Sequence, residues 1–500
     1  MLNKPPNIIF IITDQQRLDT INALGYNYMR TPNLDRLVEN GVSYTNAFCC
    51  GATSVAARAA LFTGMYPHNT GVYSFDHWSH HSSWIQDLAD INYHCVNIGK
   101  MHIIPIYDNI GFHERRVIEN KCQKFSQYGV QEDEWGWWLR MHGCEREVDR
   151  HLKDPNWTKK YNAIAWDRDE ELHSDIFCGN TAVSWIKTWN WNKPLFLQIG
   201  FPGPHEPYDP PQRFIDLYKD IEVPLPIKSH ENLNSKPIQH KAFRHFFKYT
   251  KNDESQIDLS SASDSDIIRL RKHYFGNISL IDEKIGEILK ALEEVGQLDN
   301  SVVIFTSDHG DNLGDHGLPY KWLMYDSIVN IPMVISDFRK NSNINRVDES
   351  LVSHIDLGPT ILNIAGIENI PQRLEGRSLL QKEVALFPET VFCEDNYLIM
   401  MREKKFKLVY YIGQFEDGEL YDLQNDPDEL NNLWHSLEFK NKKLMMIEKL
   451  LRWLTMSNYK NKNYKTNEEN KILRLPGSEK FGPFLHGQIT ALPDDKQTLS

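Results

Sequence analysis

Continuous runs of β-branched and other apolar residues recur along the chain and indicate buried β-strands. The first run, NIIFIIT at residues 7–13, is followed directly by Asp14. Similar runs lie at residues 93–98, 195–200, 302–306 and 332–335. Segments with a helical spacing of apolar residues lie between these runs, at residues 33–40, 83–89, 180–188 and 264–295. The alternation of strands and helices predicts the α/β class, with buried parallel strands.

The character of the sequence changes after about residue 385. Short segments typical of antiparallel strands follow one another there: ETVFCE, YLIMMREKKFKLVYYI and GELYDL. A helix is predicted at about residues 441–455, and the chain is polar and irregular from about residue 458. We therefore predict a large α/β domain at residues 1–385 and a smaller α+β domain with an irregular tail at residues 386–500.

The composition is that of a globular protein, with 41% hydrophobic and 25% charged residues. The 55 Lys and Arg residues against 68 Asp and Glu residues give a net charge of −13. Such a chain repels polyanions, so nucleic acid is not an expected partner. Any anionic substrate must therefore be attracted by a local group of cations.

The sequence predicts neither a membrane span nor a secretion signal. No run of about 18 apolar residues is present. The start of the chain, MLNKPPNIIFIITDQQ, has an apolar stretch shorter than the roughly 7–15 residues of a signal-peptide core. We expect a cytoplasmic location. A chain from which a leader had been removed would have the same sequence, and would then be periplasmic or secreted.

Polar pairs follow two of the predicted strands. Asp14-Gln15 follows the first strand, and Asp308-His309 follows residues 302–306. Ligands of open α/β sheets bind at the carboxyl ends of the strands, where these pairs would collect. Carboxylate and amide oxygens with one imidazole suit a hard divalent cation such as Ca²⁺, Mg²⁺ or Mn²⁺. Taken alone, each pair is a weak signal, because an Asp after a strand more often belongs to a turn or a helix cap than to a metal site.

Residues 54–64, SVAARAALFTG, predict a helix with Ser54 at its N-terminus and Arg58 four positions later. Positions i and i+4 share one face of a helix, so Arg58 can hold or activate a group on Ser54. The helix dipole favours an anion at this end. The alternative is a serine that only caps an alanine-rich helix.

The order of these elements resembles the sulfatase family. The family signature, C/S-x-P/A-x-R with a Thr-Gly a few residues later, stands here as Ser54-Val55-Ala56-Ala57-Arg58 and Thr63-Gly64. Further elements in the family's order span most of residues 5–435: NIIFIITDQ, TPNLDRLVENGVSYTNAF, GKMH, GPHEPY, TSDHGDNLGDHG, HIDLGPTIL and GELYDLQNDPDELNNL. The resemblance implies an alkaline-phosphatase-like fold, in which helices flank a mixed, mostly parallel sheet, and hydrolysis of a sulfate monoester.

The resemblance also implies a modified nucleophile. In sulfatases the first signature residue is oxidised to formylglycine, whose hydrate attacks sulfur and later expels sulfate by collapse to the aldehyde. A formylglycine-generating maturase would then be a partner of this chain. One divalent metal is implied, with Ca²⁺ preferred over Mn²⁺ or Mg²⁺, and its ligands would be Asp14, Gln15, Ser54, Asp308 and His309.

The other site residues are transferred from the family one at a time. Arg58 would orient the nucleophile. Lys100 and His102 would stabilise it and help its collapse, with His102 as the base. His205 and Lys321 would hold the transferred group and assist protonation of the leaving group. Together these cations would supply the local positive field that the acidic chain lacks.

The signature departs from the family's commoner form in two places. Ser54 replaces Cys, and Ala56-Ala57 replaces Pro-Ser. Three explanations fit: a serine-type sulfatase matured by a radical enzyme, an engineered Cys→Ser form, or an unmodified serine that acts on phosphate. Two rival functions therefore stay open. One is a phosphonate monoester or phosphodiester hydrolase with the same fold, and the other is a catalytically silent binding protein.

The substrate is the least determined feature of the sequence. Tryptophans are dense between the motifs, and residues 135–138 are a possible substrate-facing loop where Trp faces could stack on sugar rings. A carbohydrate sulfate is therefore one candidate substrate. Specificity is expected in loops such as residues 121–156 and 214–263. No motif indicates an oligomeric state.

Overall fold

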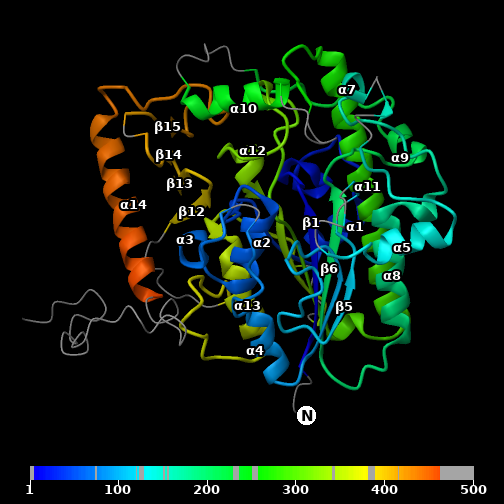
Figure 1. Ribbon diagram of the computed structural model, residues 1–500. Coiled ribbons are helices and arrows are strands. Elements are labelled where there is room, and N and C mark those ends of the chain that lie inside the picture. The colour runs from blue at the N-terminus through cyan, green and yellow to red at the C-terminus, as the bar shows by residue number, and fades with distance from the viewer. Residues whose placement is uncertain are drawn as a thin grey trace, which may run out of the picture.

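A computed structural model describes residues 5–73, 76–119, 121–122, 125, 129–149, 153–154, 157–228, 236–249, 257–339, 344–380, 389–414 and 416–461. An eight-stranded sheet lies between two layers of helices, and three-stranded and four-stranded sheets accompany it (Figure 1). Within the described residues, no helix combines the length and the apolar character needed to cross a membrane.

The central sheet is mixed but mostly parallel. Its strand order is β10 (Arg346–Asp348), β2 (Gly41–Tyr44), β9 (Met333–Asp337), β7 (Ser301–Ser307), β1 (Asn7–Asp14), β6 (Leu195–Pro204), β4 (His94–Gly99) and β5 (Glu114–Val117). Strand β1 pairs in parallel with both β6 and β7. The apolar run at residues 332–335 instead contributes to β9, which is antiparallel to β7 and β2.

Helices cover both faces of this sheet. One layer contains α2 (Ser54–Thr63), α4 (Trp84–Asp90) and α13 (Leu357–Ile364), and the other contains α1 (Pro32–Glu39), α8 (Ser174–Thr188) and α11 (Asp264–Glu294). Side chains of β1 alternate between the two cores, with Phe10 in the first and Ile9 and Ile11 in the second. Burial on both faces explains why β1 is apolar at successive positions.

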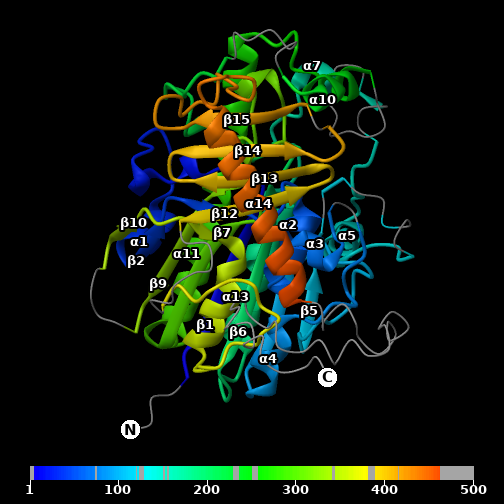
Figure 2. The same cartoon turned by 90° about the vertical axis from the view of Figure 1, so that its left-hand side faces the viewer.

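A smaller antiparallel sheet forms the C-terminal domain. Its order is β12 (Thr390–Asp395), β13 (Leu398–Glu403), β14 (Phe406–Tyr411) and β15 (Gly418–Asp422). Helix α14 (Lys440–Lys460) lies across this sheet (Figure 2) and buries Met446, Leu450 and Trp453 against it. The predicted fold class is thereby confirmed. The boundary at residue 385 stays a prediction.

Two helices are longer than the sequence predicts. Helix α8 begins at Ser174 rather than at residue 180. Helix α14 continues to Lys460, so the irregular tail does not begin at residue 458. Burial of Ser457 shows that the last turns of α14 still contact the protein. The rest of the predicted tail, residues 462–500, lies outside the described residues.

The tryptophan-rich segment is not a loop. Residues 135–138 belong to helix α5 (Glu134–Met141). The carboxylate of Asp133 caps this helix by accepting a hydrogen bond from the Gly136 N–H at 2.8 Å. Trp135 is buried in the core, whereas Trp137 is 44% exposed. The loop prediction was wrong, because the Asp133 cap starts a helix at this point.

Lys407 of β14 connects the C-terminal sheet to the large domain. Its ammonium group is fully buried and lies 2.7 Å from both the Met324 carbonyl oxygen and Asp326 Oδ1. It also forms an ion pair with Glu429. Met324 and Asp326 follow Lys321 closely in the chain. Lys407 therefore supports the segment that carries one of the predicted site residues.

Replacing Lys407 with Met should lower the free energy of unfolding by about 3–5 kcal/mol, because two carboxylates lose a buried partner. Chemical denaturation measures this change. Lys442→Met is the control, since Lys442 forms a partly exposed ion pair with Glu403 and should cost less than about 1 kcal/mol. Equal losses in the two variants would contradict the proposed link.

Candidate active site

The sheet brings the predicted site residues to one edge. Strands β1, β4, β6 and β7 are mutually parallel, and their carboxyl ends lead into Asp14, Lys100, His205 and Asp308 respectively. This is the edge at which open α/β sheets bind ligands. Helix α2 completes the arrangement by placing Ser54 opposite these strand ends.

Ser54 is the first residue of α2, as the sequence predicts. The N-cap residue is Thr53, so Ser54 does not occupy the capping position. Instead Ser54 Oγ lies 2.9 Å from His309 Nε2, 3.2 Å from Asp14 Oδ1 and 3.4 Å from Lys321 Nζ. The residue is 3% exposed. The hydroxyl is thus surrounded by acidic, basic and imidazole groups, which a cap alone would not need.

Asp14, Asp308 and His309 form the one group in the described residues that has metal-ligand character, with ligand atoms within 4.8 Å of one another. His309 Nδ1 donates to the Gly310 carbonyl oxygen at 2.9 Å, which leaves the lone pair on Nε2. Burial lowers the pKa of His309 and favours the neutral ring that a metal requires. These residues fit a divalent cation.

Gln15 offers a further oxygen. Its amide nitrogen donates to Glu206 Oε2 at 2.8 Å and to Asp311 Oδ2 at 2.6 Å. Asp311 is held in turn by the Tyr208 hydroxyl at 2.6 Å. These contacts set the orientation of the Gln15 amide, and its Oε1 is buried without a hydrogen bond to any described residue. An unsatisfied buried oxygen is suited to a cation.

Arg58 lies behind the two carboxylates. Its Nε donates to Asp308 Oδ2 at 2.9 Å, and its Nη1 donates to the Lys100 carbonyl oxygen at the same distance. Its Nη2 is 3.8 Å from Asp14 Oδ2. The guanidinium is fully buried, so these contacts fix it firmly. Arg58 thus connects α2 to the ends of β1, β4 and β7.

Lys100 and His102 lie on the loop after β4. Lys100 Nζ is 2.7 Å from Asp14 Oδ2. Burial alone would raise the pKa of Asp14, but the positive charge of Lys100 and of other nearby cations holds it well below its usual value. Burial and the proximity of Lys100 lower the pKa of His102 well below its ordinary value. His102 is therefore neutral in this surrounding of cations.

Glu119 holds this loop in place. Its carboxylate accepts hydrogen bonds from the backbone N–H groups of Met101 at 3.2 Å and His102 at 3.0 Å. His102 has a φ of 54°, in the left-handed region that non-glycine residues rarely adopt. The two hydrogen bonds offset this strain and fix the position of the imidazole.

His205 and Lys321 approach the site from two further loops. His205 Nδ1 donates to the Glu206 carbonyl oxygen at 2.9 Å. Lys321 Nζ lies 3.3 Å from His309 Nε2. The residues on either side of Lys321, Tyr320 and Trp322, both have positive φ values, of 59° and 77°. Strained backbone of this kind is concentrated at functional sites.

Comparison with known proteins identifies the family. The sequence profile of the sulfatase family matches residues 6–367, which is more than half of the chain. The chain belongs to the sulfatase family. A profile of the C-terminal region of N-sulphoglucosamine sulphohydrolase matches residues 314–455 of this sulfatase. That match includes the four-stranded sheet and most of α14.

Relatives of this sulfatase act on aryl and carbohydrate sulfates. An arylsulfatase of Clostridium perfringens is 30% identical over 466 residues, covering 87% of this chain and 91% of the relative. An N-acetylglucosamine-6-O-sulfatase of Bacteroides thetaiotaomicron is 24% identical, covering 89% and 86%. The phosphonate monoester hydrolase of Agrobacterium radiobacter has a similar fold, with a TM-score of 0.76, 23% identity and coverage of 90% and 96%.

Three residues of this site were not identified from the sequence: Glu119, Glu206 and Asp311. Glu206 and Asp311 lie inside the motifs GPHEPY and TSDHGDNLGDHG, so the sequence could have indicated both as site residues. Glu119 lies in no motif, and only the structure connects it to His102. Glu206 and Asp311 bind the side chain of Gln15, a predicted metal ligand. Glu119 binds the backbone of His102, the predicted base.

Asp308→Ala should lower the melting temperature and abolish the rise in melting temperature that Ca²⁺ causes, because a ligand and the partner of buried Arg58 are lost together. Thermal unfolding with and without Ca²⁺ measures both effects. For the unchanged protein, Ca²⁺ at about 100 times its Kd should add about 2.7 kcal/mol.

Asp282→Ala is the matched control. This carboxylate of α11 is also buried, and it accepts hydrogen bonds from the backbone N–H groups of Asn33 at 3.1 Å and Leu34 at 2.7 Å, away from the site. The control should lose stability but keep its response to Ca²⁺. A normal response in Asp308→Ala would show that this carboxylate is not a ligand.

Proposed function

We propose that this sulfatase hydrolyses a sulfate monoester of a carbohydrate, with residue 54 as nucleophile and one divalent metal, preferably Ca²⁺. The observation that carries the proposal is the position of Ser54 Oγ, within 3.4 Å of His309, Asp14 and Lys321. A nucleophile at a helix N-terminus beside cations is suited to an anionic group. The carbohydrate relative supports the substrate class.

Asp14, Gln15, Asp308 and His309 are the proposed metal ligands, together with residue 54. When present, the metal would neutralise charge on the sulfuryl group, and formylglycine at residue 54 would provide the attacking oxygen. A maturase is accordingly a proposed partner. Ser54 is compatible with such a modification because its Oγ contacts Asp14 and His309 of the site.

The cations of the chain would bind the sulfuryl group. Arg58 fixes Asp308, one of the proposed ligands. Lys321 lies 3.4 Å from Ser54 Oγ, and Lys100 pairs with Asp14, which itself contacts Ser54. Their contacts should strengthen as negative charge grows in the transition state. His102 accepts the proton that allows the product to leave, and His205 holds the transferred group beside Lys321.

Hydrolysis of a phosphonate monoester or phosphodiester is the second candidate. The fold of the phosphonate monoester hydrolase supports it, since the same set of cations can bind a tetrahedral phosphorus centre. The third possibility from the sequence, a catalytically silent protein that keeps the pocket, would apply if residue 54 is never modified.

The three candidates can be separated in one experiment. The protein is coexpressed with a formylglycine-generating maturase, and the peptide that contains residue 54 is analysed by mass spectrometry, where the modification lowers the mass by about 2 Da. The matured protein is then assayed on sulfated sugars, aryl sulfates, phosphonate monoesters and phosphodiesters. Modification with a clear preference for sulfated sugars supports the proposal. Activity on phosphorus esters alone would replace it with the second candidate.

Lys321→Met should reduce kcat/KM for the sulfate ester by roughly 30- to 1000-fold, equivalent to about 2–4 kcal/mol, because one charge-assisted contact to the transition state is lost. Lys284→Met provides the control. Lys284 is also buried, but it binds Asn180 and Glu287 on the helical face of the domain. A large loss of kcat/KM in the control, or none in Lys321→Met, would contradict the assignment.

His102→Ala should behave differently from Lys321→Met, because it should slow the release of the transferred group from residue 54 rather than the attack on the ester. We expect a rapid burst of alcohol release followed by near arrest. Mass spectrometry should find the transferred group still attached to residue 54. Rapid mixing with a chromogenic aryl sulfate measures the burst. Steady turnover without a burst would assign the base role to another group, and His205 would be tested next.

A further inference from the structure

Helix α10 (Ile238–Tyr249) packs against the segment that carries Lys321. Residues 316–325 are called the Lys321 loop below. Figure 1 shows α10 next to β15 of the C-terminal sheet. Lys321 lies in the middle of its loop, with Nζ 3.4 Å from Ser54 Oγ. No residue of α10 is a predicted site residue, so the proposed chemistry gives this helix no role of its own.

Helix α10 contacts both ends of the Lys321 loop. At the start of the loop, Arg244 Nη2 donates to the His316 carbonyl oxygen at 2.8 Å. At the end of the loop, the rings of His240 and Tyr325 meet edge to face, with their centroids 5.7 Å apart. Arg244 and His240 lie one helical turn apart on α10, so one face of this helix follows the loop from end to end.

The two neighbours of Lys321 are covered by aromatic rings of α10. The centroid of the Phe247 ring lies 5.8 Å from the ring centroids of both Tyr320 and Trp322. The Phe243 ring stacks on Trp322 at 6.1 Å. Tyr320 and Trp322 have positive φ values, and such strained backbone persists only where the surrounding structure enforces it. The rings of α10 thus help to enforce the conformation on either side of Lys321.

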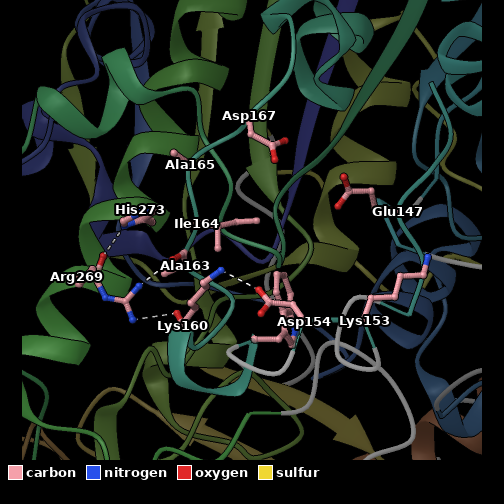
Figure 3. Close-up of a pocket in the computed structure, with 11 residues that line it drawn as sticks. Glu147, Lys153, Asp154, Lys160, Ala163, Ile164, Ala165, Asp167, Arg269 and His273 are labelled. Atoms are coloured by element: carbon pink, nitrogen blue, oxygen red, sulfur yellow. Dashed lines mark hydrogen bonds and ion pairs between the residues drawn. The ribbon is translucent and has the colours of Figure 1, made fainter. Parts of the chain in front are cut away.

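The large domain also contacts the Lys321 loop. The side-chain amide of Asn162 donates to the Tyr320 hydroxyl at 2.8 Å, and both residues are buried. The next residue, Ala163, lines a cavity of about 770 Å³ beside α11 (Figure 3), and no described residue of the Lys321 loop lines that cavity. The contact at Asn162 therefore orients the Tyr320 hydroxyl, whereas the aromatic contacts with Trp322 come from α10.

A buried polar contact fixes α10 to the C-terminal sheet. His240 Nε2 donates to Glu419 Oε1 of β15 at 2.5 Å, and both side chains are buried. The hydroxyls of Tyr411 and Tyr421 also donate to the Glu419 carboxylate, and Lys236 Nζ lies 2.9 Å from the Tyr421 hydroxyl. Burial alone would raise the pKa of Glu419, but His240 and Lys236 hold it below its usual value. Removal of His240 would therefore leave a buried, charged carboxylate without one of its donors.

We propose that α10 positions Lys321 for the reaction at residue 54, and that His240 and Glu419 are the positioning residues that fix α10. This inference rests on the role proposed for Lys321. It adds that the C-terminal domain, through Glu419, determines where the Lys321 ammonium group lies. His240 and Glu419 act through the Lys321 loop, so their effect on turnover should depend on the presence of Lys321.

A double-mutant cycle between His240 and Lys321 tests the proposal. The probes are 4-nitrophenyl sulfate and N-acetylglucosamine-6-sulfate, assayed with the matured protein. His240→Ala should lower kcat about tenfold with little change in KM, because a misplaced Lys321 loses a contact made in the transition state. In a Lys321→Met background, His240→Ala should change kcat by less than about twofold. His240→Gln keeps a donor for Glu419 and should restore most of the activity.

Two further variants keep the test decisive. His94→Ala is the control, because His94 at the start of β4 also pairs with a glutamate, Glu114, at 2.9 Å, and it should leave kcat unchanged. Phe243→Ala removes a ring of α10 but keeps its polar anchor, and it replaces His240→Ala in the cycle if that variant does not fold. No loss of kcat in either α10 variant, or losses that multiply with that of Lys321→Met, overturn the proposal.

Failure of the proposed function gives a different result. If only phosphorus esters are hydrolysed, the same cycle is measured with 4-nitrophenyl phenylphosphonate and has the same two outcomes. If no ester is hydrolysed, hydrogen–deuterium exchange of the Lys321 loop decides, since the backbone N–H groups of Tyr320 and Trp322 are hydrogen-bonded. Faster exchange confined to this loop in His240→Ala, and absent in His94→Ala, supports the positioning role. Unchanged exchange in His240→Ala overturns it.

Discussion

Repulsion between two buried carboxylates governs the architecture around the site. Asp14 and Asp308 follow neighbouring parallel strands, so the sheet itself brings two negative charges close together in a region without solvent. Such a pair is tolerated only beside compensating cations. Arg58 approaches Asp308 to 2.9 Å, and Lys100 approaches Asp14 to 2.7 Å. The position of α2 and the course of the loop after β4 therefore follow from the same electrostatic requirement.

The loops around this pair are held in unfavourable conformations. Gln15, His102, Tyr320 and Trp322 all have positive φ values, each of which costs about 1–3 kcal/mol for a residue with a side chain. Hydrogen bonds with neighbouring residues offset that cost; for example, the His102 N–H donates to the Glu119 carboxylate. The fixed geometry places polar groups ready for a ligand, so little reorganisation is needed when charge develops.

Much of this arrangement could be predicted from the sequence, because the apolar runs and the polar residues that follow them are distinct. Apolar runs of the right length marked β1, β4, β6 and β7, and the polar residues after them had to meet at one edge if the strands were parallel. The direction of β9 could not be read in the same way, since a short buried strand has the same pattern in either orientation. The role of Glu119 could not be predicted, because it depends on contact with His102, seventeen residues earlier in the chain and on the other side of strand β5. Local periodicity contains no information about such pairings.

The contact between Lys407 and the segment after Lys321 has a consequence for the order of synthesis. The two partners of the hydrogen bond from Lys407 to Met324 are 83 positions apart in the chain. Domains generally fold as the N-terminal part leaves the ribosome first. Here the loop that carries Lys321 leaves the ribosome before Lys407 is available to bind Met324. The final shape of that loop, and with it any turnover, must wait until β14 has been translated and has paired with its neighbours.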